Sequence, residues 1–427
     1  DSSIYTDFPA GTGIFGGGEA PFVGNEVFLE RPEGMVPLPE DYVPSRGDAL
    51  VIVVTRPARY PSDAIFENWE GGSVTLGYPD GSRVRVGTVV RPVRGVGRFT
   101  GLSLADEVVG RGEADLVAFG RQFLADPDFI LKTREGRPEE IRKCIACNQG
   151  CIERLILGEG NIRCAINPET GQELLYPRGP AAERRKVWVI GGGPAGMTAA
   201  LEAARLGHRV DLYEKEDTCG GQLRYAGKPP FKSAYEEWGA WLETQMKKAG
   251  VRVHTGRRMT EEMLREEGPE AVILATGGEK IVPDLPGIDL PHVCDAWKIL
   301  SGQVSPGDHP LVIGGGLIGM ETADFLSRKG SRVTLVEVLK RSPVLKITSH
   351  GYMLHTRLRE AGCRLFFDTA VERIDASSVT LKSHGTEEVL SPIDQVVIAV
   401  GLKAGDGLRK FLEEKGIRHF VAGDAAS

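Results

Sequence analysis

The sequence is short of cysteine, of histidine and of long apolar runs. It has 7 cysteines and 8 histidines in 427 residues. No apolar stretch reaches the roughly 18 to 20 residues that cross a bilayer, and the opening DSSIYTDFPAG lacks the basic and apolar regions of a signal peptide. We therefore expect no membrane span and a cytoplasmic location.

The charge balance also excludes a class of partner. The net charge is −7 and the sequence pI is about 5.8. Lysine and arginine are dispersed, so no basic surface for nucleic acid is expected. With 41% hydrophobic and 26% charged residues, the chain is typical of a globular protein of two to four domains.

The first hundred residues differ in pattern from the rest. Short β-like runs occupy residues 49–55, 73–78 and 83–90, with a turn at 79–82. This predicts a β-rich module at 1–100, to which we assign no function. From residue 102 the pattern becomes α/β, with a helix from Ser103 to about residue 110.

A dinucleotide-binding motif begins at residue 186. An apolar strand precedes Gly191, Gly193 and Gly196, a small-residue helix follows, and a second strand ends at Glu214. The glycines permit a tight turn, close approach of a pyrophosphate to the helix N-terminus, and close helix packing. Glu214 is placed to accept the ribose hydroxyls.

The same unit recurs at residues 310–337. It carries Gly314, Gly316, Gly319 and Glu337. The first glycine and the acid each lie 123 residues after their counterparts in the first unit (314 − 191 and 337 − 214). An internal repeat of a whole βαβ unit predicts two Rossmann-like domains and two bound dinucleotides.

Motifs after each unit resemble those of the two-dinucleotide flavoprotein disulfide reductases. Apolar strands end at residues 278 and 401, and the sequence closes on FVAGDAAS. The resemblance implies FAD in the first domain, NAD(P)H in the second, and a return to FAD at Gly423 and Asp424. Gln222, in TCGGQL, is also expected to contact FAD.

Two choices at these sites depend on single residues. Glu337 would repel a 2′-phosphate and favours NADH, whereas Lys340 and Arg341 could accommodate NADPH. Cys219 could belong to a redox disulfide, but no CxxC surrounds it, so we expect a small residue beside the flavin.

Four of the seven cysteines are gathered in one segment. Cys144, Cys147 and Cys151 form CxxCxxxC, and twelve residues separate Cys151 from Cys164. Four thiolates suit either a [4Fe–4S] cluster or a tetrahedral zinc. Zinc ribbons usually pair two CxxC knuckles and this segment has one, so we expect the cluster, in a reducing compartment.

Residues 112–155, joined through NPETG to GGGPAG, resemble one family in detail. They look like 2,4-dienoyl-CoA reductase, enoate reductase and trimethylamine dehydrogenase, in which an old-yellow-enzyme-like FMN barrel precedes a [4Fe–4S] cluster and an FAD/NAD(P)H module. The resemblance runs from about residue 102 to 427. It implies that the four cysteines bind the cluster, that 114–120 is the last barrel strand, and that Gly120 and Arg121 hold the FMN phosphate. Without FMN, Arg121 would make a surface ion pair.

The chain departs from that family at its start. An eight-stranded barrel needs roughly 200 residues, and about a hundred precede the expected last strand. No histidine occurs before His208, so we assign no catalytic residue. The expected fold is α/β, with two Rossmann-like domains preceded by the end of a TIM-barrel-like segment, an iron–sulfur cluster and the β-rich module. The expected domains are 1–100, 101–178 (barrel end and cluster loop), 179–305 (FAD), 306–401 (NAD(P)H) and 402–427 (return to FAD).

Two functions fit these expectations. One is an NAD(P)H-dependent iron–sulfur flavoenzyme that reduces an activated C=C bond of the enoyl-CoA or enoate type. The other is an electron-transfer subunit with FAD and cluster alone, which delivers electrons to a partner protein. The expected partners are NAD(P)H and a small unsaturated substrate or an acceptor protein, and we expect an oligomer.

Overall fold

The computed structural model describes five strands between residues 25 and 88, and then residues 100–426 apart from 112–116, 118, 159, 177–178, 345–347 and 406. The chain divides into two units, Asp1–Phe119 and Gly120–Ser427.

The first unit contains two small antiparallel sheets and a helix. One sheet has the order β2-β1-β3, and the other pairs β4 with β5. The elements are β1 (Asn25–Arg31), β2 (Gly34–Pro37), β3 (Leu50–Val54), β4 (Ser73–Gly77), β5 (Arg83–Thr88) and α2 (Leu102–Gly110). Strands β3 to β5 lie within the predicted runs, whereas β1 and β2 were not predicted. The expected turn at 79–82 and most of the expected strand at 114–120 lie outside the described residues.

The second unit begins with the segment that carries the cysteines. Its elements are α3 (Arg121–Ala125), α4 (Phe129–Arg134), η2 (Pro138–Glu140), η3 (Gln149–Glu153) and α5 (Arg154–Leu157). Two buried polar side chains hold it together. Gln122 donates to the carbonyl of Arg142 and accepts from the amide of Cys144, at 3.0 and 2.9 Å. Asp126 accepts from the amide of Arg142 at 2.8 Å and pairs with Lys132.

A five-stranded parallel sheet follows, in the order β20-β9-β6-β7-β8. Its strands are β6 (Lys186–Ile190), β7 (Arg209–Tyr213), β8 (Arg252–His254), β9 (Ala271–Leu274) and β20 (His419–Val421). Strands of parallel sheets are covered on both faces and are apolar throughout. Here α6 (Pro194–Arg205) and α8 (Ser233–Lys248) cover one face, and α9 (Glu261–Glu267) and α13 (Arg409–Glu414) cover the other.

A second parallel sheet has the order β11-β18-β12-β13-β14. Its strands are β11 (Val293–Asp295), β12 (Pro310–Ile313), β13 (Thr334–Val336), β14 (Arg364–Phe366) and β18 (Gln395–Ile398). One face carries α10 (Ala296–Leu300), α11 (Leu317–Arg328) and α12 (Ser349–Glu360). The other packs on an antiparallel sheet of β15 (Ala370–Ile374), β16 (Val379–Ser383) and β17 (Thr386–Leu390).

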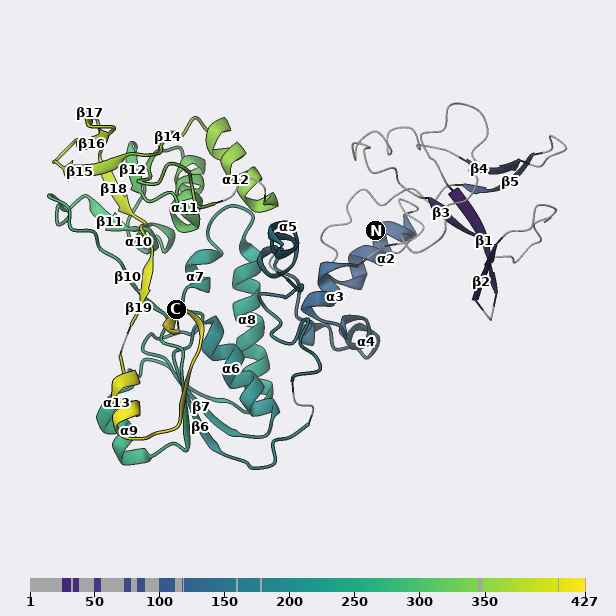
Figure 1. Ribbon diagram of the computed structural model, residues 1–427. Coiled ribbons are helices and arrows are strands. Elements are labelled where there is room, and N and C mark those ends of the chain that lie inside the picture. Colours follow the sequence, from purple (N-terminus) through teal and green to yellow (C-terminus); the bar gives the residue numbers. More distant parts are fainter. Residues whose placement is uncertain are drawn as a thin grey trace. The chain divides into compact units, whose positions relative to one another are not determined.

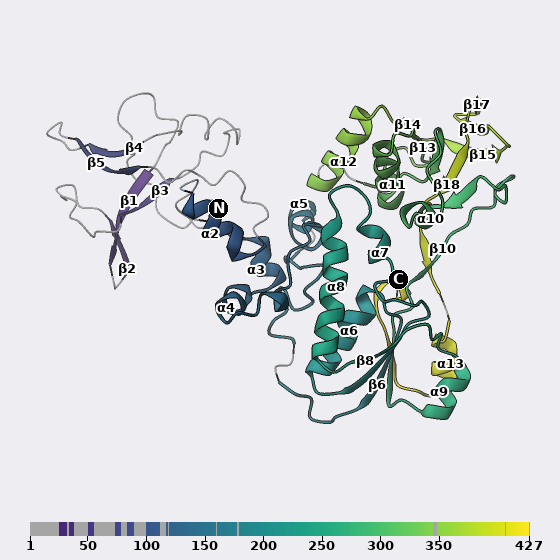
Figure 2. The same ribbon diagram turned by 180° about the vertical axis from the view of Figure 1, so that it is seen from behind.

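The two parallel sheets form separate cores joined by a narrow ribbon. Strands β10 (Gly278–Lys280) and β19 (Leu402–Ala404) pair antiparallel, and Figures 1 and 2 show β10 between the two parallel sheets. The chain thus leaves the first core, builds the second, and returns to the first at β20. In the described part of the chain, no helix has the length and apolar character needed to cross a membrane.

Candidate functional site

The first glycine turn lies between β6 and α6. Gly191 has φ +108°, and a Cβ there would lie 2.2 Å from the carbonyl oxygen of Ala275. On α6, a Cβ at Gly196 would lie 1.9 Å from the carbonyl oxygen of Gly191. Gly193 is the N-cap of the helix, whose first amides face the turn. The turn therefore leaves room for a pyrophosphate at a helix N-terminus.

The second glycine turn, between β12 and α11, repeats this geometry. Gly314 has φ +113°, and a Cβ there would lie 2.4 Å from the carbonyl oxygen of Ala399. A Cβ at Gly319 would lie 1.9 Å from the carbonyl oxygen of Gly314. Gly316 is the N-cap of α11. The repeat seen in the sequence is thus a repeat of backbone geometry.

The two predicted ribose acids are buried and hold the glycine turns. The Oε2 of Glu214 accepts from the amide of Gly192 at 2.6 Å, and the Oε2 of Glu337 accepts from the amide of Gly315 at 2.6 Å. The second oxygen of each accepts from the amide two residues on, at 2.9 and 2.8 Å. Each carboxylate therefore fixes its turn, which the sequence reasoning had not foreseen.

The end of the chain returns to the first turn. Gly423, with φ +67°, opens η4 (Gly423–Ala425), and a Cβ there would lie 2.7 Å from that of Ala195 in the first turn of α6. Gln222 donates to the Oδ2 of Asp424 at 3.1 Å. Three residues expected at FAD, Gln222, Gly423 and Asp424, thus meet beside the N-terminus of α6.

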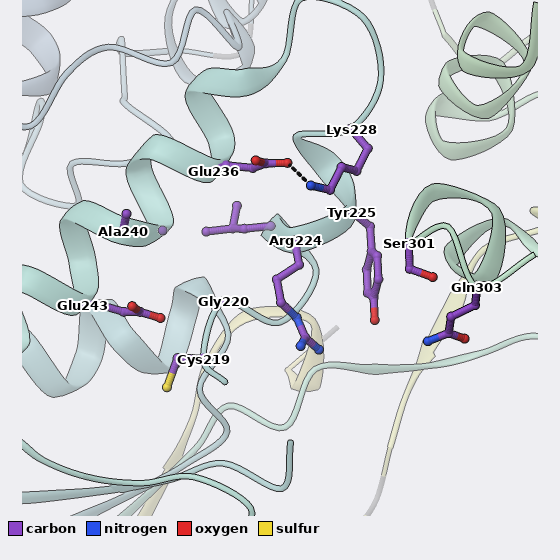
Figure 3. Close-up of a pocket in the computed structure, with 12 residues that line it drawn as sticks. Cys219, Gly220, Arg224, Tyr225, Lys228, Glu236, Ala240, Glu243, Ser301 and Gln303 are labelled. Carbon is purple, nitrogen blue, oxygen red and sulfur yellow. Dashed lines mark ion pairs between the residues drawn. The ribbon is translucent and has the colours of Figure 1, made fainter. Parts of the chain in front are cut away.

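A cavity of about 460 Å³ lies beside the first turn, between α7 (Leu223–Ala226), α8 and the loop after α10. Figure 3 shows Arg224, Tyr225 and Gln303 directed toward the same hollow. At one end Lys228 and Glu236 form an ion pair of 2.7 Å. Cys219 lines the cavity as a free, buried thiol, and burial raises its pKa to about 11. The volume falls within the range of small-molecule sites.

The four clustered cysteines surround a second cavity. Cys144, Cys147, Cys151 and Cys164 all line it and are all free thiols. Burial raises the pKa of the Cys147 thiol to about 11 and also raises those of Cys151 and Cys164. Among the residues that the structure describes, no three side chains are grouped to hold a single metal ion.

The loop between these cysteines is bent in an unusual way. Ala146 and Asn148 have φ of +55° and +62°, values that side-chain-bearing residues seldom adopt. Arg121, at the start of α3, donates to the Oδ1 of Asn148 and lines the cysteine cavity. Gly120 is the N-cap of this helix. The two residues expected at the FMN phosphate thus lie beside the cysteines.

Helix α8 supplies residues of this region that the sequence reasoning missed. Tyr235 and Trp238 pack with Cys144, Cys147 and Cys164 against a small apolar core. Trp238 also packs against the core of the first parallel sheet. The spacing of aromatic residues along α8 was the only signal in the sequence. That pattern is equally typical of any buried helix face.

Comparison with known families identifies the larger part of the chain. Residues 185–423 match the family model of pyridine nucleotide-disulphide oxidoreductases, which is more than half of the 427 residues. The chain belongs to this family. Residues 67–140 match a second model, the NADH:flavin oxidoreductase / NADH oxidase family. That match starts before residue 102, where the resemblance was expected to begin. The two matches together confirm the predicted enoate and dienoyl-CoA reductase-like membership.

Individual relatives agree with both matches. The chain is 38% identical over 340 residues to an NADH oxidase of Thermoanaerobacter brockii, covering 78% of this chain and 52% of the relative. It is 38% identical over 333 residues to a bilirubin reductase of Mediterraneibacter gnavus, with the same coverages. A 2-naphthoyl-CoA reductase in complex with 2-naphthoyl-CoA superposes with a TM-score of 0.72 at 30% identity, covering 77% of this chain and 50% of that one. The chain spans about half the length of these relatives.

Proposed function

We propose that the protein is an NAD(P)H-dependent iron–sulfur flavoprotein oxidoreductase that reduces an activated carbon–carbon double bond of the enoyl-CoA or enoate type. The observation that carries the proposal is the cavity lined by four free cysteines, within the unit that holds both glycine turns. The acyl-thioester substrate of the 2-naphthoyl-CoA reductase supports the substrate class.

The two glycine turns fit the pyrophosphates of FAD and NADH. At Gly191 and Gly196, and again at Gly314 and Gly319, any Cβ would overlap backbone, so only glycine lets each helix begin this close to its strand, with its first amides at the turn. Gly193, Glu214, Gln222, Gly423 and Asp424 would complete the FAD site.

NADH is the proposed second dinucleotide. The buried Glu337 carboxylate accepts two backbone amides, which hold it at the end of β13, and a carboxylate at that place would repel a 2′-phosphate. Lys340 and Arg341 are exposed in the loop that follows, and NADPH is the alternative that they would favour. Gly316 and the first turn of α11 would hold the pyrophosphate.

The four cysteines fit an iron–sulfur cluster by their chemistry. All four are unpaired thiols that face one cavity, as thiolate ligation requires. Cys144, Cys147, Cys151 and Cys164 would be the ligands, and the α8 residues Tyr235 and Trp238 pack against the apolar core beside them. When bound, FAD accepts a two-electron hydride and releases electrons singly, and a cluster carries one electron at a time.

FMN is proposed as the cofactor at which the double bond would be reduced. Arg121 and Gly120 are its proposed phosphate contacts, because a guanidinium forms bidentate hydrogen bonds to phosphate. Arg121 lines the cysteine cavity, so an FMN held there would lie near the cluster.

Flavin analysis of protein purified without oxygen tests the proposal. Extracted flavins are separated into FAD and FMN and counted per chain. FAD and FMN in equal amounts would support reduction of an unsaturated substrate by this protein. FAD without FMN would instead favour the electron-transfer subunit, and absence of both would contradict each.

A further inference from the structure

A buried ion pair connects the two dinucleotide domains. The Nζ of Lys232 lies 2.5 Å from the Oε1 of Glu321, and their side chains are 9% and 8% exposed. Lys232 is the N-cap residue of α8, which packs on the FAD domain, whereas Glu321 is on α11, the helix of the second glycine turn. His350 of α12 also approaches Glu321, at 3.0 Å.

This pair fixes the position of α11 relative to α8. Two buried charges are stable together because each compensates the desolvation of the other, and moving them apart leaves both uncompensated. Glu321 lies five residues after Gly316, which caps α11. A dinucleotide that binds at that cap acts on the same short helix.

The contact continues from Lys232 toward the cysteines. Its ammonium lies 4.4 Å from the ring centroid of Tyr235, within the range of a cation–π interaction. Tyr235, together with Cys147, packs against the apolar core beside the cysteine cavity. One charged side chain is therefore in contact both with the NADH-domain helix and with a residue of the cysteine site.

The rest of the same α8 face holds the cysteine segment. Trp241 lies under Arg142 at 5.2 Å, Gln245 donates to the carbonyl of Glu139 at 3.3 Å, and Lys248 pairs with Glu139 and Glu140. These positions recur every three or four residues, as one helix face requires. At the other end of this face, Lys232 forms its ion pair with the NADH domain.

We propose that Lys232 is a positioning residue that couples dinucleotide binding at α11 to the properties of the cysteine-bound cluster. The inference rests on the proposed function, because it requires the cluster. Binding of NAD⁺ restrains α11, the Glu321 carboxylate holds the Lys232 ammonium, and the ammonium restrains Tyr235 beside Cys147. Hydrogen bonding and packing around a cluster set its reduction potential, so NAD⁺ shifts that potential.

The test is a redox titration of the cluster, followed by electron paramagnetic resonance, with and without NAD⁺. NAD⁺ is used at concentrations that saturate each variant, as determined by calorimetry. The wild-type protein is expected to show a shifted midpoint potential with NAD⁺, and Lys232→Met is expected to lose that shift. Lys248→Met is the matched control, because it removes a lysine ion pair from the same helix without touching the NADH domain, and it should keep the shift.

A shift of wild-type size in Lys232→Met would overturn the inference, as would a wild-type protein whose potential ignores NAD⁺. Should Lys232→Met fail to fold, the double variant K232M/E321L removes both charges, a replacement that buried pairs often tolerate, and should also lose the shift. Iron content is measured on every sample. A wild-type protein without iron would refute the proposed function itself, whereas an iron-loaded protein without the shift would refute only the coupling.

Discussion

Gly319→Ala should impair the proposed NADH site and leave the proposed FAD site intact. The added Cβ would lie 1.9 Å from the carbonyl oxygen of Gly314, and ordinary van der Waals contact begins at 3.4 Å. The first turn of α11 must therefore retreat from β12 by about 1.5 Å, the difference between these distances. Alanine is well accommodated by helical backbone dihedrals. The expected damage therefore comes only from the steric overlap of its Cβ.

The expected loss follows from that displacement. The displaced amides of α11 would lose hydrogen bonding to the charged pyrophosphate, which is worth about 1.5 to 3 kcal/mol, so we expect the Kd for NADH to rise about tenfold to a hundredfold. Overpacking of this kind also costs about 1 to 3 kcal/mol of stability. FAD content should stay unchanged, because its glycine turn belongs to the other parallel sheet.

Two variants complete the assay, which measures NADH binding by calorimetry and FAD by absorbance. Gly196→Ala, with the same 1.9 Å overlap at the first turn, should lose FAD. Gly239→Ala in α8 is the control, since its Cβ would lie 3.7 Å from Leu223, an ordinary contact. If Gly319→Ala lost FAD and kept NADH, the assignment of the two sites would be reversed.

Three further changes test other parts of the account. Cys147→Ser should abolish cluster absorbance and leave FAD bound, and loss of FAD with iron retained would refute the ligand assignment. Asp424→Ala removes the acceptor that Gln222 contacts and should weaken FAD retention about tenfold without affecting the Kd for NADH, measured by calorimetry after FAD is restored. Asp211→Asn should lower the free energy of unfolding by about 2 kcal/mol at neutral pH, as loss of charge-assisted hydrogen bonds does. Burial alone would raise the pKa of Asp211, but hydrogen bonds from His254 and Arg252 outweigh it and lower that pKa. The stabilisation is therefore present above about pH 3.9 and is lost as the pH falls further, which denaturant titrations at several pH values measure.

The two βαβ units with glycine turns were predictable because their signals are local. Gly191 and Gly314 need a left-handed backbone and a close neighbour, and only glycine meets both conditions. The strand, helix and acid that surround each turn lie within about thirty residues in sequence, so periodicity and spacing suffice to find them.

Long-range contacts were beyond the sequence. Nothing in the spacing of Lys232 and Glu321, 89 residues apart, indicates that they meet. The contacts of Glu214 and Glu337 with the amides of the glycine turns were missed for another reason. The expected contact with ribose already accounts for a carboxylate at that position, so the sequence offers no sign of a further contact.

The β-rich start of the chain shows a different limit. Strands β1 and β2 were missed because Glu, Asn, Arg and Gly interrupt their alternation. The family match that begins at residue 67 was also not foreseen, since the resemblance was recognised only from the motifs after residue 102.

An anaerobic titration with NADH, followed by absorbance and electron paramagnetic resonance, tests the central claim most directly. The account predicts that NADH bleaches the FAD absorbance and that the signal of a reduced [4Fe–4S] cluster then grows, with both changes requiring a much higher NADH concentration in Gly319→Ala. A cluster that dithionite reduces and NADH does not would contradict the account, because the two dinucleotide sites and the cysteine site would then not work as one electron path.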